Sequence, residues 1–185
     1  MSPKSAKESE PQVARDERAF LGEEFLTWLW WRFEAGESEY DLGGGRSVGI
    51  ALDGPLVLRD RREDEEGKRP EQSLRHGRPL SGVEAAAALK RGKRLVRARL
   101  IVADADREWN TTFDAETFSL RSCSVPESEE EEAHVRALET VTAYEQISTA
   151  LDGVFRTFLL ERLSPEYTDR SLPKLRDWVR SKPLS

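Results

Sequence analysis

The chain has 185 residues, which suits one domain with tails. Its 35 acidic and 29 basic residues give a formal net charge of -6, which does not indicate a protein that binds polyanions over its whole surface. A local basic patch is still compatible with this charge. A single cysteine, Cys123, excludes an intramolecular disulfide, and no apolar run forms a signal peptide or spans a bilayer, so we expect a cytoplasmic protein.

The first predicted element is a helix over residues 17–35, preceded by a polar, proline-containing tail over 1–16 that we predict to be disordered. Large apolar side chains recur in this helix at three- and four-residue spacing. They are Leu21, Phe25, Trp28, Leu29 and Phe33. Trp30 and Trp31 lie off that face, so the helix should be a core element covered on more than one side.

Two short apolar runs follow, 47–52 and 55–59. We predict that they are the strands of a hairpin, because the Asp53-Gly54 pair between them is typical of a two-residue turn. Residues 60–80 carry charges of both signs and few apolar side chains, a composition typical of a mobile surface loop.

The middle of the chain predicts one short helix and three strands. A helix is expected over 81–91, where Ser81 and Glu84 have the spacing of a capping box. Residues 94–102, 108–114 and 117–122 are rich in branched or alternating apolar side chains and are joined by short polar turns. They are therefore predicted to form an antiparallel meander.

A long apolar periodicity over 128–163 predicts a second major helix, and a short helix is expected over 173–180. Together these elements predict one α+β domain over 17–181. In that domain an antiparallel sheet of about five strands is covered by the aromatic-rich N-terminal helix and the long C-terminal helix.

The most informative polar feature is a basic stretch in which six of ten residues are Lys or Arg. These residues are Lys90, Arg91, Lys93, Arg94, Arg97 and Arg99. On the predicted strand Arg97 and Arg99 share one face, so they could lie along a phosphate backbone. The alternative is a solvated face on which the arginines pair with the abundant glutamates, and the sequence leaves both interpretations open.

Catalytic chemistry has little support. His76 and His134 lie in different segments, so we predict neither a metal site nor a cofactor. Cys123 has no histidine near it in sequence, so we predict that it is a structural cysteine. A metal-dependent nuclease would need clustered carboxylates. The candidates for that minor alternative are Asp104, Asp106 and Asp114.

One segment resembles a known family. The sequence Phe20-Leu-Gly-Glu-Glu-Phe-Leu-Thr-Trp-Leu-Trp-Trp-Arg-Phe-Glu34 is similar to a segment of the RdgC family of recombination-associated proteins. Later pieces follow in the order of RdgC-like chains. They are the Arg91-Gly-Lys corner, the strand through Leu100, Arg107-Glu-Trp109 with Phe113-Asp114, and the Leu159-Leu-Glu-Arg-Leu-Ser-Pro165 helix end.

This resemblance implies a non-enzymatic, nucleoid-associated homodimer that encircles double-stranded DNA with little sequence preference and modulates recombinase filaments. Family members are typically longer, and this chain resembles only their later part, which puts encirclement in question. Two functions therefore stay open. One is a DNA-binding accessory protein, and the other is an interaction or assembly domain of the same fold without DNA binding.

Overall fold

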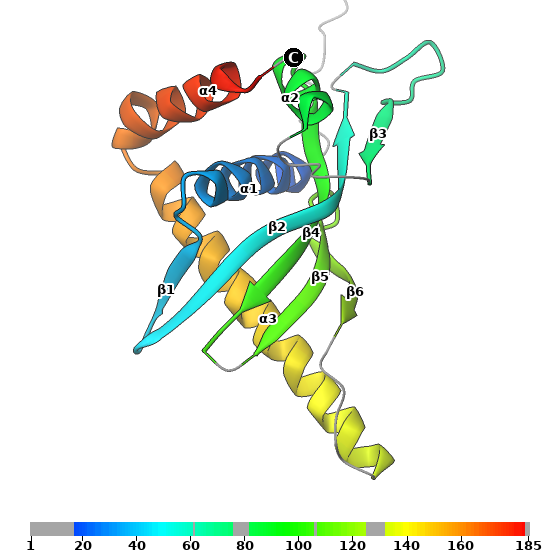
Figure 1. Cartoon of the computed structure of the whole chain (residues 1–185), viewed down its shortest axis with the longest axis vertical. Helices are drawn as coiled ribbons and strands as arrows, with labels where there is room; N and C mark the ends of the chain where they lie inside the picture. Colours follow the sequence, from blue (N-terminus) through cyan, green and yellow to red (C-terminus); the bar gives the residue numbers. More distant parts are fainter. Residues whose placement is uncertain (1–16, 61, 76–81, 106, 125–131, 184–185) are drawn as a thin grey trace, which may run out of the picture.

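The computed structural model describes residues 17–60, 62–75, 82–105, 107–124 and 132–183, with side chains from Leu21 onward. It is a mixed α+β fold, as predicted (Figure 1). The elements in chain order are α1 Glu17–Glu34, β1 Glu39–Gly43, β2 Arg46–Arg59, β3 Glu71–Leu74, α2 Val83–Lys90, β4 Arg94–Ala103, β5 Glu108–Asp114, β6 Ser119–Ser124, α3 Ala133–Arg162, a short π-helix Tyr167–Ser171 and α4 Leu172–Ser181. The predicted tail 1–16 and the Ser81 cap lie outside the described residues.

All strands pair antiparallel, in the order β1-β2-β4-β5-β6, with β3 added to β2. The 14-residue β2 is the long central strand. Its first half lies between β1 and β4, and its second half lies between β3 and β4. The predicted meander of β4, β5 and β6 is confirmed.

The predicted hairpin at Asp53-Gly54 is wrong. Strand β2 continues through this pair, and the residues on either side of it pair with β4. The register shifts between Asp53 and Leu56, so the Asp-Gly pair belongs to a bulge rather than a turn. The true turn joins β1 to β2, where Gly43, Gly44 and Gly45 all have positive φ, a conformation that glycine adopts without steric cost.

The prediction of a loop over 60–80 is wrong for residues 71–74, which form β3. Leu74 is buried and lies opposite the buried Leu56 of β2. Burial of one leucine and four residues of strand pairing stabilise this segment, and neither is visible in its local composition. The predicted loop also includes residues 61 and 76–80, which the structure does not describe.

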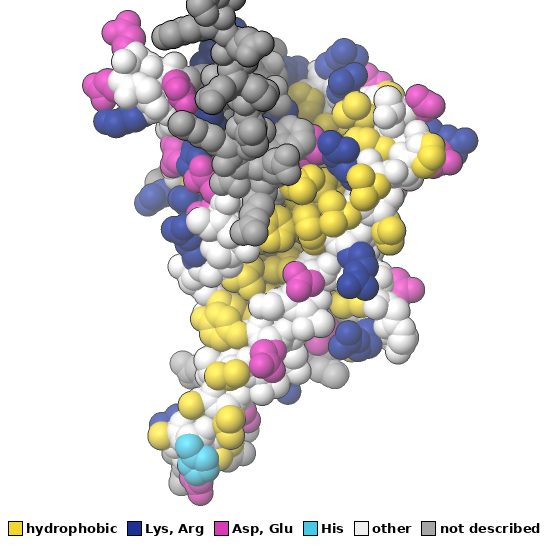
Figure 2. Space-filling view, turned by 180° about the vertical axis from the view of Figure 1, so that it is seen from behind, with side chains coloured by type: hydrophobic (Ala, Val, Ile, Leu, Met, Phe, Trp, Pro, Cys, Tyr) yellow, Lys and Arg dark blue, Asp and Glu magenta, His cyan; other side chains and the backbone are white. Residues whose placement is uncertain are grey.

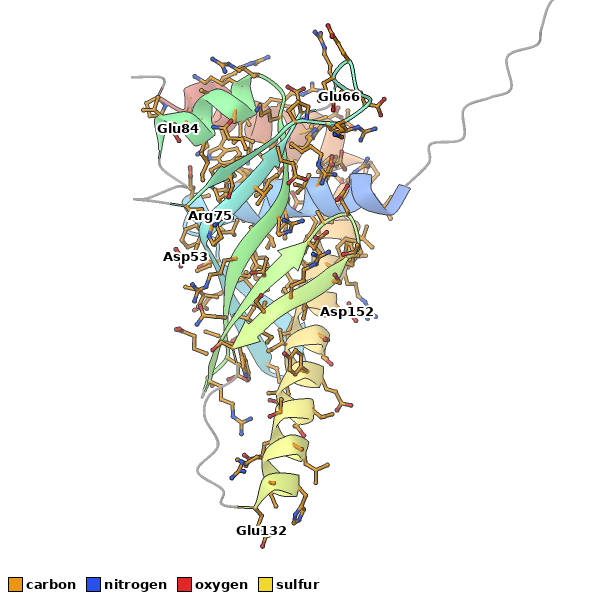
Figure 3. All side chains as sticks on the ribbon, turned by 90° about the vertical axis from the view of Figure 1, so that its right-hand side faces the viewer. Asp53, Glu66, Arg75, Glu84, Glu132 and Asp152 are labelled. Atoms are coloured by element: carbon orange, nitrogen blue, oxygen red, sulfur yellow. The ribbon has the colours of Figure 1, made fainter. Side chains whose placement is uncertain are left out.

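The helices lie on one face of the sheet. Helix α1 crosses β4 and β2, and α3 packs against β1 and α1 (Figure 1). Along β4 the residues Ala98, Leu100 and Val102 are buried beneath the helices, and the residues between them are half-buried on the other face. The first turns of α3, which precede the buried Ala143, extend past the end of the sheet (Figures 1 and 3).

The aromatic helix is the centre of the core, as predicted. Phe25, Trp28 and Trp30 are completely buried. The ring of Phe25 lies 5.6 Å from the ring of Phe113 on β5 and 5.6 Å from that of Phe158 on α3, so one side chain joins both helices to the sheet. Edge-to-face and tilted ring pairs at such distances add to the free energy of burial.

Candidate functional site

The face of the sheet opposite the helices carries the predicted basic residues of β4. Arg97 and Arg99 alternate with the buried Ala98 and Leu100, so both point to this second face, which we call the open face. Arg99 lies opposite Asp53 of β2 and Thr112 of β5. Figure 3 shows Asp53 projecting from the side of the sheet away from α3.

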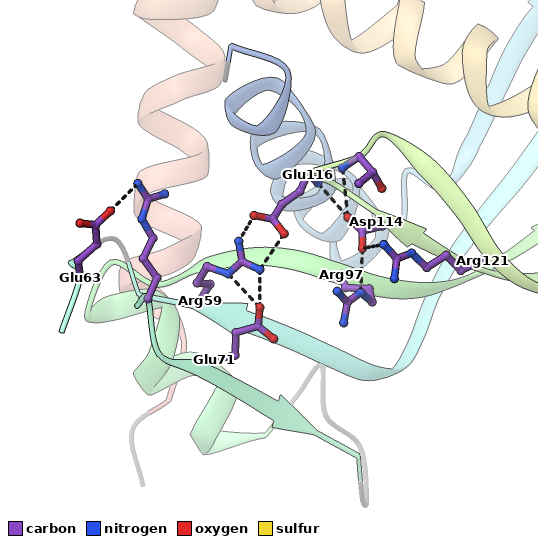
Figure 4. Close-up of polar contacts among 9 residues, drawn as sticks. Arg59, Glu63, Glu71, Arg97, Asp114, Glu116 and Arg121 are labelled. Carbon is purple, nitrogen blue, oxygen red and sulfur yellow. Dashed lines mark hydrogen bonds and ion pairs between the residues drawn. The ribbon is translucent and has the colours of Figure 1, made fainter. Parts of the chain in front are cut away.

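Asp114 is the buried acidic group of the open face. Its side chain is only 2 % exposed, and Oδ2 lies 3.1 Å from Nε of Arg97 and 3.1 Å from Nη2 of Arg121 (Figure 4). Burial alone would raise the pKa of this carboxyl, but the backbone N–H of Thr117 and the two arginines outweigh it and hold the pKa below its ordinary value of 3.8. The carboxylate is therefore ionised and shared between two cations.

A second ion cluster adjoins the first. The guanidinium of Arg59 donates to both oxygens of Glu116 and also to Glu71, with Nε 3.0 Å from Glu71 Oε1 (Figure 4). The hydrogen bond to Glu116 is the main cause that raises the pKa of Arg59, so the arginine stays charged. This cluster has one cation and two anions, and the Asp114 cluster has two cations and one anion, so the two together are neutral.

The six predicted phosphate-binding residues are not brought to one surface. Arg94, opposite Arg59, joins Arg97 and Arg99 on the open face. In contrast, Lys90 Nζ donates to the backbone carbonyl of Lys182 at 2.6 Å, and Lys93 Nζ lies 3.3 Å from Gln72 Oε1.

Arg91 is exposed at the end of α2, outside the sheet. Sequence reasoning missed Arg121, which is 52 % exposed on β6. Its register partner is Thr112 of β5, which in turn lies opposite Arg99, so Arg121 adds a basic side chain two strands away from β4 on the same face. The meander prediction together with strand alternation was the signal that could have found it.

The candidate carboxylates of a nuclease do not come together. Asp104 follows β4 and Asp114 ends β5, so these two residues lie at opposite ends of the β4–β5 pair. Asp106 lies outside the described residues. In the part of the chain that the structure describes, no group of three His, Cys, Asp or Glu side chains is arranged to hold a metal ion. Cys123 is half-buried, and burial raises the pKa of its thiol.

A second surface was not predicted as a site. Three large apolar side chains are exposed in the first half of α3: Leu138 at 64 %, Val141 at 55 % and Tyr144 at 42 %. Tyr144 also lines a groove of about 310 Å³ between α3 and the β5–β6 end of the sheet. Other residues lining this groove are Phe113, Phe118, Leu120 and Leu151.

We call these three residues and the groove the α3 surface. Figure 2 shows hydrophobic side chains gathered on the face of the molecule that α3 crosses. Because exposed apolar side chains that adjoin an apolar groove are typical of interaction sites, this surface is a candidate docking site. None of the described helices is long and apolar enough to cross a membrane.

Comparisons with protein-family models, with curated proteins and with solved structures found no significant match to the chain.

Proposed function

We propose that the chain is a non-enzymatic assembly domain that associates with a second copy of itself through the α3 surface. The observation that carries this proposal is the exposure of Leu138, Val141 and Tyr144 on a helix that extends past its own sheet. Leaving three large apolar side chains in water forgoes roughly 1.5–3 kcal/mol for each one that a partner could bury.

A second copy fits this surface because both β6 and α3 can pair with the same element of another copy. Within the described chain β6 pairs only with β5, so its outer edge presents unpaired backbone groups beside the groove. A two-fold axis pairs an edge strand with itself antiparallel and likewise pairs a helix with itself. With the axis near Val141, Leu138 of each copy packs against Tyr144 of the other. The resemblance to the homodimeric RdgC proteins supports the same partner.

The test is the mass of the protein in solution, measured by light scattering on a sizing column over a wide concentration range. The parent should run as a dimer, and the double variant Leu138→Glu/Val141→Glu should run as a folded monomer, with the melting temperature that the parent has when it is dilute enough to dissociate. Glu139→Lys is the control, since it changes the charge of the same helix by two units of the opposite sign on another face and should stay dimeric. A monomeric parent at every concentration refutes the proposal.

Double-stranded DNA binding is the second candidate, and one observation favours it: Arg97 and Arg99 of β4 and Arg121 of β6 lie on one face of the sheet, which no described helix covers. In the described part of the chain Arg99 is in no ion pair. The charge balance of the neighbouring ion clusters makes this the weaker candidate, because phosphate binding requires cations that are not already neutralised.

The experiment is fluorescence anisotropy with labelled duplexes of unrelated sequence at low salt. Arg97→Ala/Arg99→Ala/Arg121→Ala should weaken binding to all duplexes about equally and reduce its salt dependence. Arg156→Ala, an exposed arginine of α3, is the control. If the triple variant binds as the parent does, these arginines are not the interface. If the parent shows no binding, DNA binding is excluded and the assembly proposal is unaffected.

A further inference from the structure

A cluster of aromatic and charged side chains lies away from both surfaces, where α4 meets α1. It consists of Trp30 and Glu34 on α1, Trp178 on α4 and Lys182, which follows α4. The two indole rings are 5.6 Å apart at 79° to one another. Their N–H groups donate to different oxygens of Glu34, each at 2.8 Å. One carboxylate thus fixes the orientation of two tryptophans.

The ammonium of Lys182 occupies the corner between these rings. Its Nζ lies 4.6 Å from the centroid of the Trp30 ring, 4.4 Å from that of the Trp178 ring and 2.7 Å from Glu34 Oε1. Lys182 is only 8 % exposed. Two aromatic faces and one carboxylate around a cation are the chemistry by which proteins bind organic ammonium ions. Burying an ammonium is costly unless it is paired. Here Trp30, Trp178 and Glu34, which we call the cage, provide the pairing.

The backbone conformation at Lys182 positions its side chain in the cage. The chain leaves the helical conformation at Lys182, with φ -59° and ψ 137°, and Lys90 Nζ holds the carbonyl of the same residue at 2.6 Å. Glu34, the two indoles and Lys90 belong to α1, α4 and α2, so the cage is held by three helices. Only Lys182 among its charged members lies outside a helix.

We propose that Trp30, Trp178 and Glu34 form a binding site for a primary alkylammonium group, that the side chain of Lys182 is its resident ligand, and that a free primary alkylammonium ion takes its place when the Lys182 side chain is removed. A primary ammonium is specified because Glu34 Oε1 accepts an N–H, which a quaternary ammonium cannot provide. A tethered ligand competes at an effective concentration in the millimolar range, so a free amine binds more weakly while Lys182 is in place. This inference does not depend on the proposed assembly function.

The experiment uses the full chain with Lys182→Ala and titrates n-butylammonium chloride against sodium chloride of equal ionic strength, with tryptophan fluorescence as the signal. The variant should bind n-butylammonium saturably and at least tenfold more tightly than the parent, and tetramethylammonium should bind more weakly. Adding Glu34→Gln to the variant should abolish binding. A variant that responds no more than the parent overturns the proposal, and so does equal binding by the Glu34→Gln double variant.

A second measurement applies if Lys182→Ala destabilises the fold. If that variant is partly unfolded, n-butylammonium should raise its melting temperature, followed by far-UV circular dichroism, because a ligand that binds only the folded state stabilises it. The parent, whose cage is occupied, should not respond. Absence of a shift in the variant, or an equal shift in both proteins, contradicts the proposal.

Discussion

Gly22 lies where α1 passes closest to the turn after β5. A Cβ added there would lie 2.2 Å from the carbonyl oxygen of Ala115, closer than any real contact. Glycine inside a helix costs about 1 kcal/mol relative to alanine, and here the close neighbour explains it. That neighbour is backbone, which cannot rotate away.

Gly22→Ala should therefore destabilise the fold by at least about 2 kcal/mol, because displacement of α1 from the sheet outweighs the gain in helix propensity. Urea unfolding measures this change. Gly153→Ala in α3 is the matched control, since its added Cβ would meet the flexible end of the Leu42 side chain. The control should lie within about 1 kcal/mol of the parent. Equal effects of the two substitutions would show that the close approach to Ala115 is not a constraint.

The ionised carboxylate of Asp114 contributes to the stability of the fold. Because its pKa in the folded protein lies below the ordinary 3.8, the ionised group contributes stability that is present above about pH 4 and is lost as the pH falls through the folded pKa. Asp114→Asn should cost about 1.5–3 kcal/mol at pH 7, and the difference from the parent should shrink in acid. Urea unfolding between pH 7 and pH 3 tests this.

Asp53→Asn provides the comparison for that series, since Asp53 is an exposed carboxylate on the same face. It should change the stability little at any pH. A difference between parent and Asp114→Asn that does not vary with pH would mean that the carboxylate contributes by shape and hydrogen bonding alone.

At the scale of elements, the sequence predicted those that depend on local pattern. The aromatic periodicity identified α1, the long periodicity identified α3, and alternation identified β4 and β5. The bulge at Asp53 and the short strand β3 were missed because both depend on pairing between residues distant in sequence, of β2 with β4 for the bulge and of β3 with β2 for the strand. A typical turn pair is tolerated within a strand when the partner strand continues past it.

The same limit applies to the candidate site. Alternation placed Arg97 and Arg99 on one face of β4, as the structure has them. It could not reveal that Asp114 neutralises Arg97, because that carboxylate comes from the next strand, or that Lys90 binds the carbonyl of a residue 92 positions away. A basic run in a sequence gives the positions of charges but not their partners.

Helix α3 has a longer part that packs in the core and a shorter part that projects past the sheet, and two substitutions distinguish them. Phe158 is completely buried in the aromatic core, so Phe158→Ala should cost about 3–5 kcal/mol. Leu138 is mostly exposed, so Leu138→Ala should leave the stability of the folded monomer unchanged within about 0.5 kcal/mol. Chemical unfolding at low protein concentration measures both. Comparable losses would mean that Leu138 is packed within the single chain.

At the scale of the whole molecule, the sheet has one apolar and one charged face. The helices cover the first, and arginines and carboxylates in near balance occupy the second. Of the two described sheet edges, β1 and β3 share one and β6 forms the other. The α3 surface adjoins the β6 edge, so exposed apolar side chains and unpaired backbone groups lie next to one another there.

Assembly through that side predicts a melting temperature that rises with protein concentration, because dissociation is coupled to unfolding. The parent should show this dependence in differential scanning calorimetry, and Leu138→Glu/Val141→Glu should melt at one temperature at every concentration. A parent that also melts independently of concentration would contradict the assembly.

The projection of α3 beyond its sheet also has a consequence for amide hydrogen exchange. An isolated helix of about ten residues is marginal in water, because the cost of nucleation is not recovered over so few turns. In a lone chain the amides of residues 133–142 should therefore exchange with deuterium within seconds, while those near Phe158 persist. Slow exchange along the whole helix would require a contact that the single chain does not contain, and mass spectrometry would locate it to a few residues.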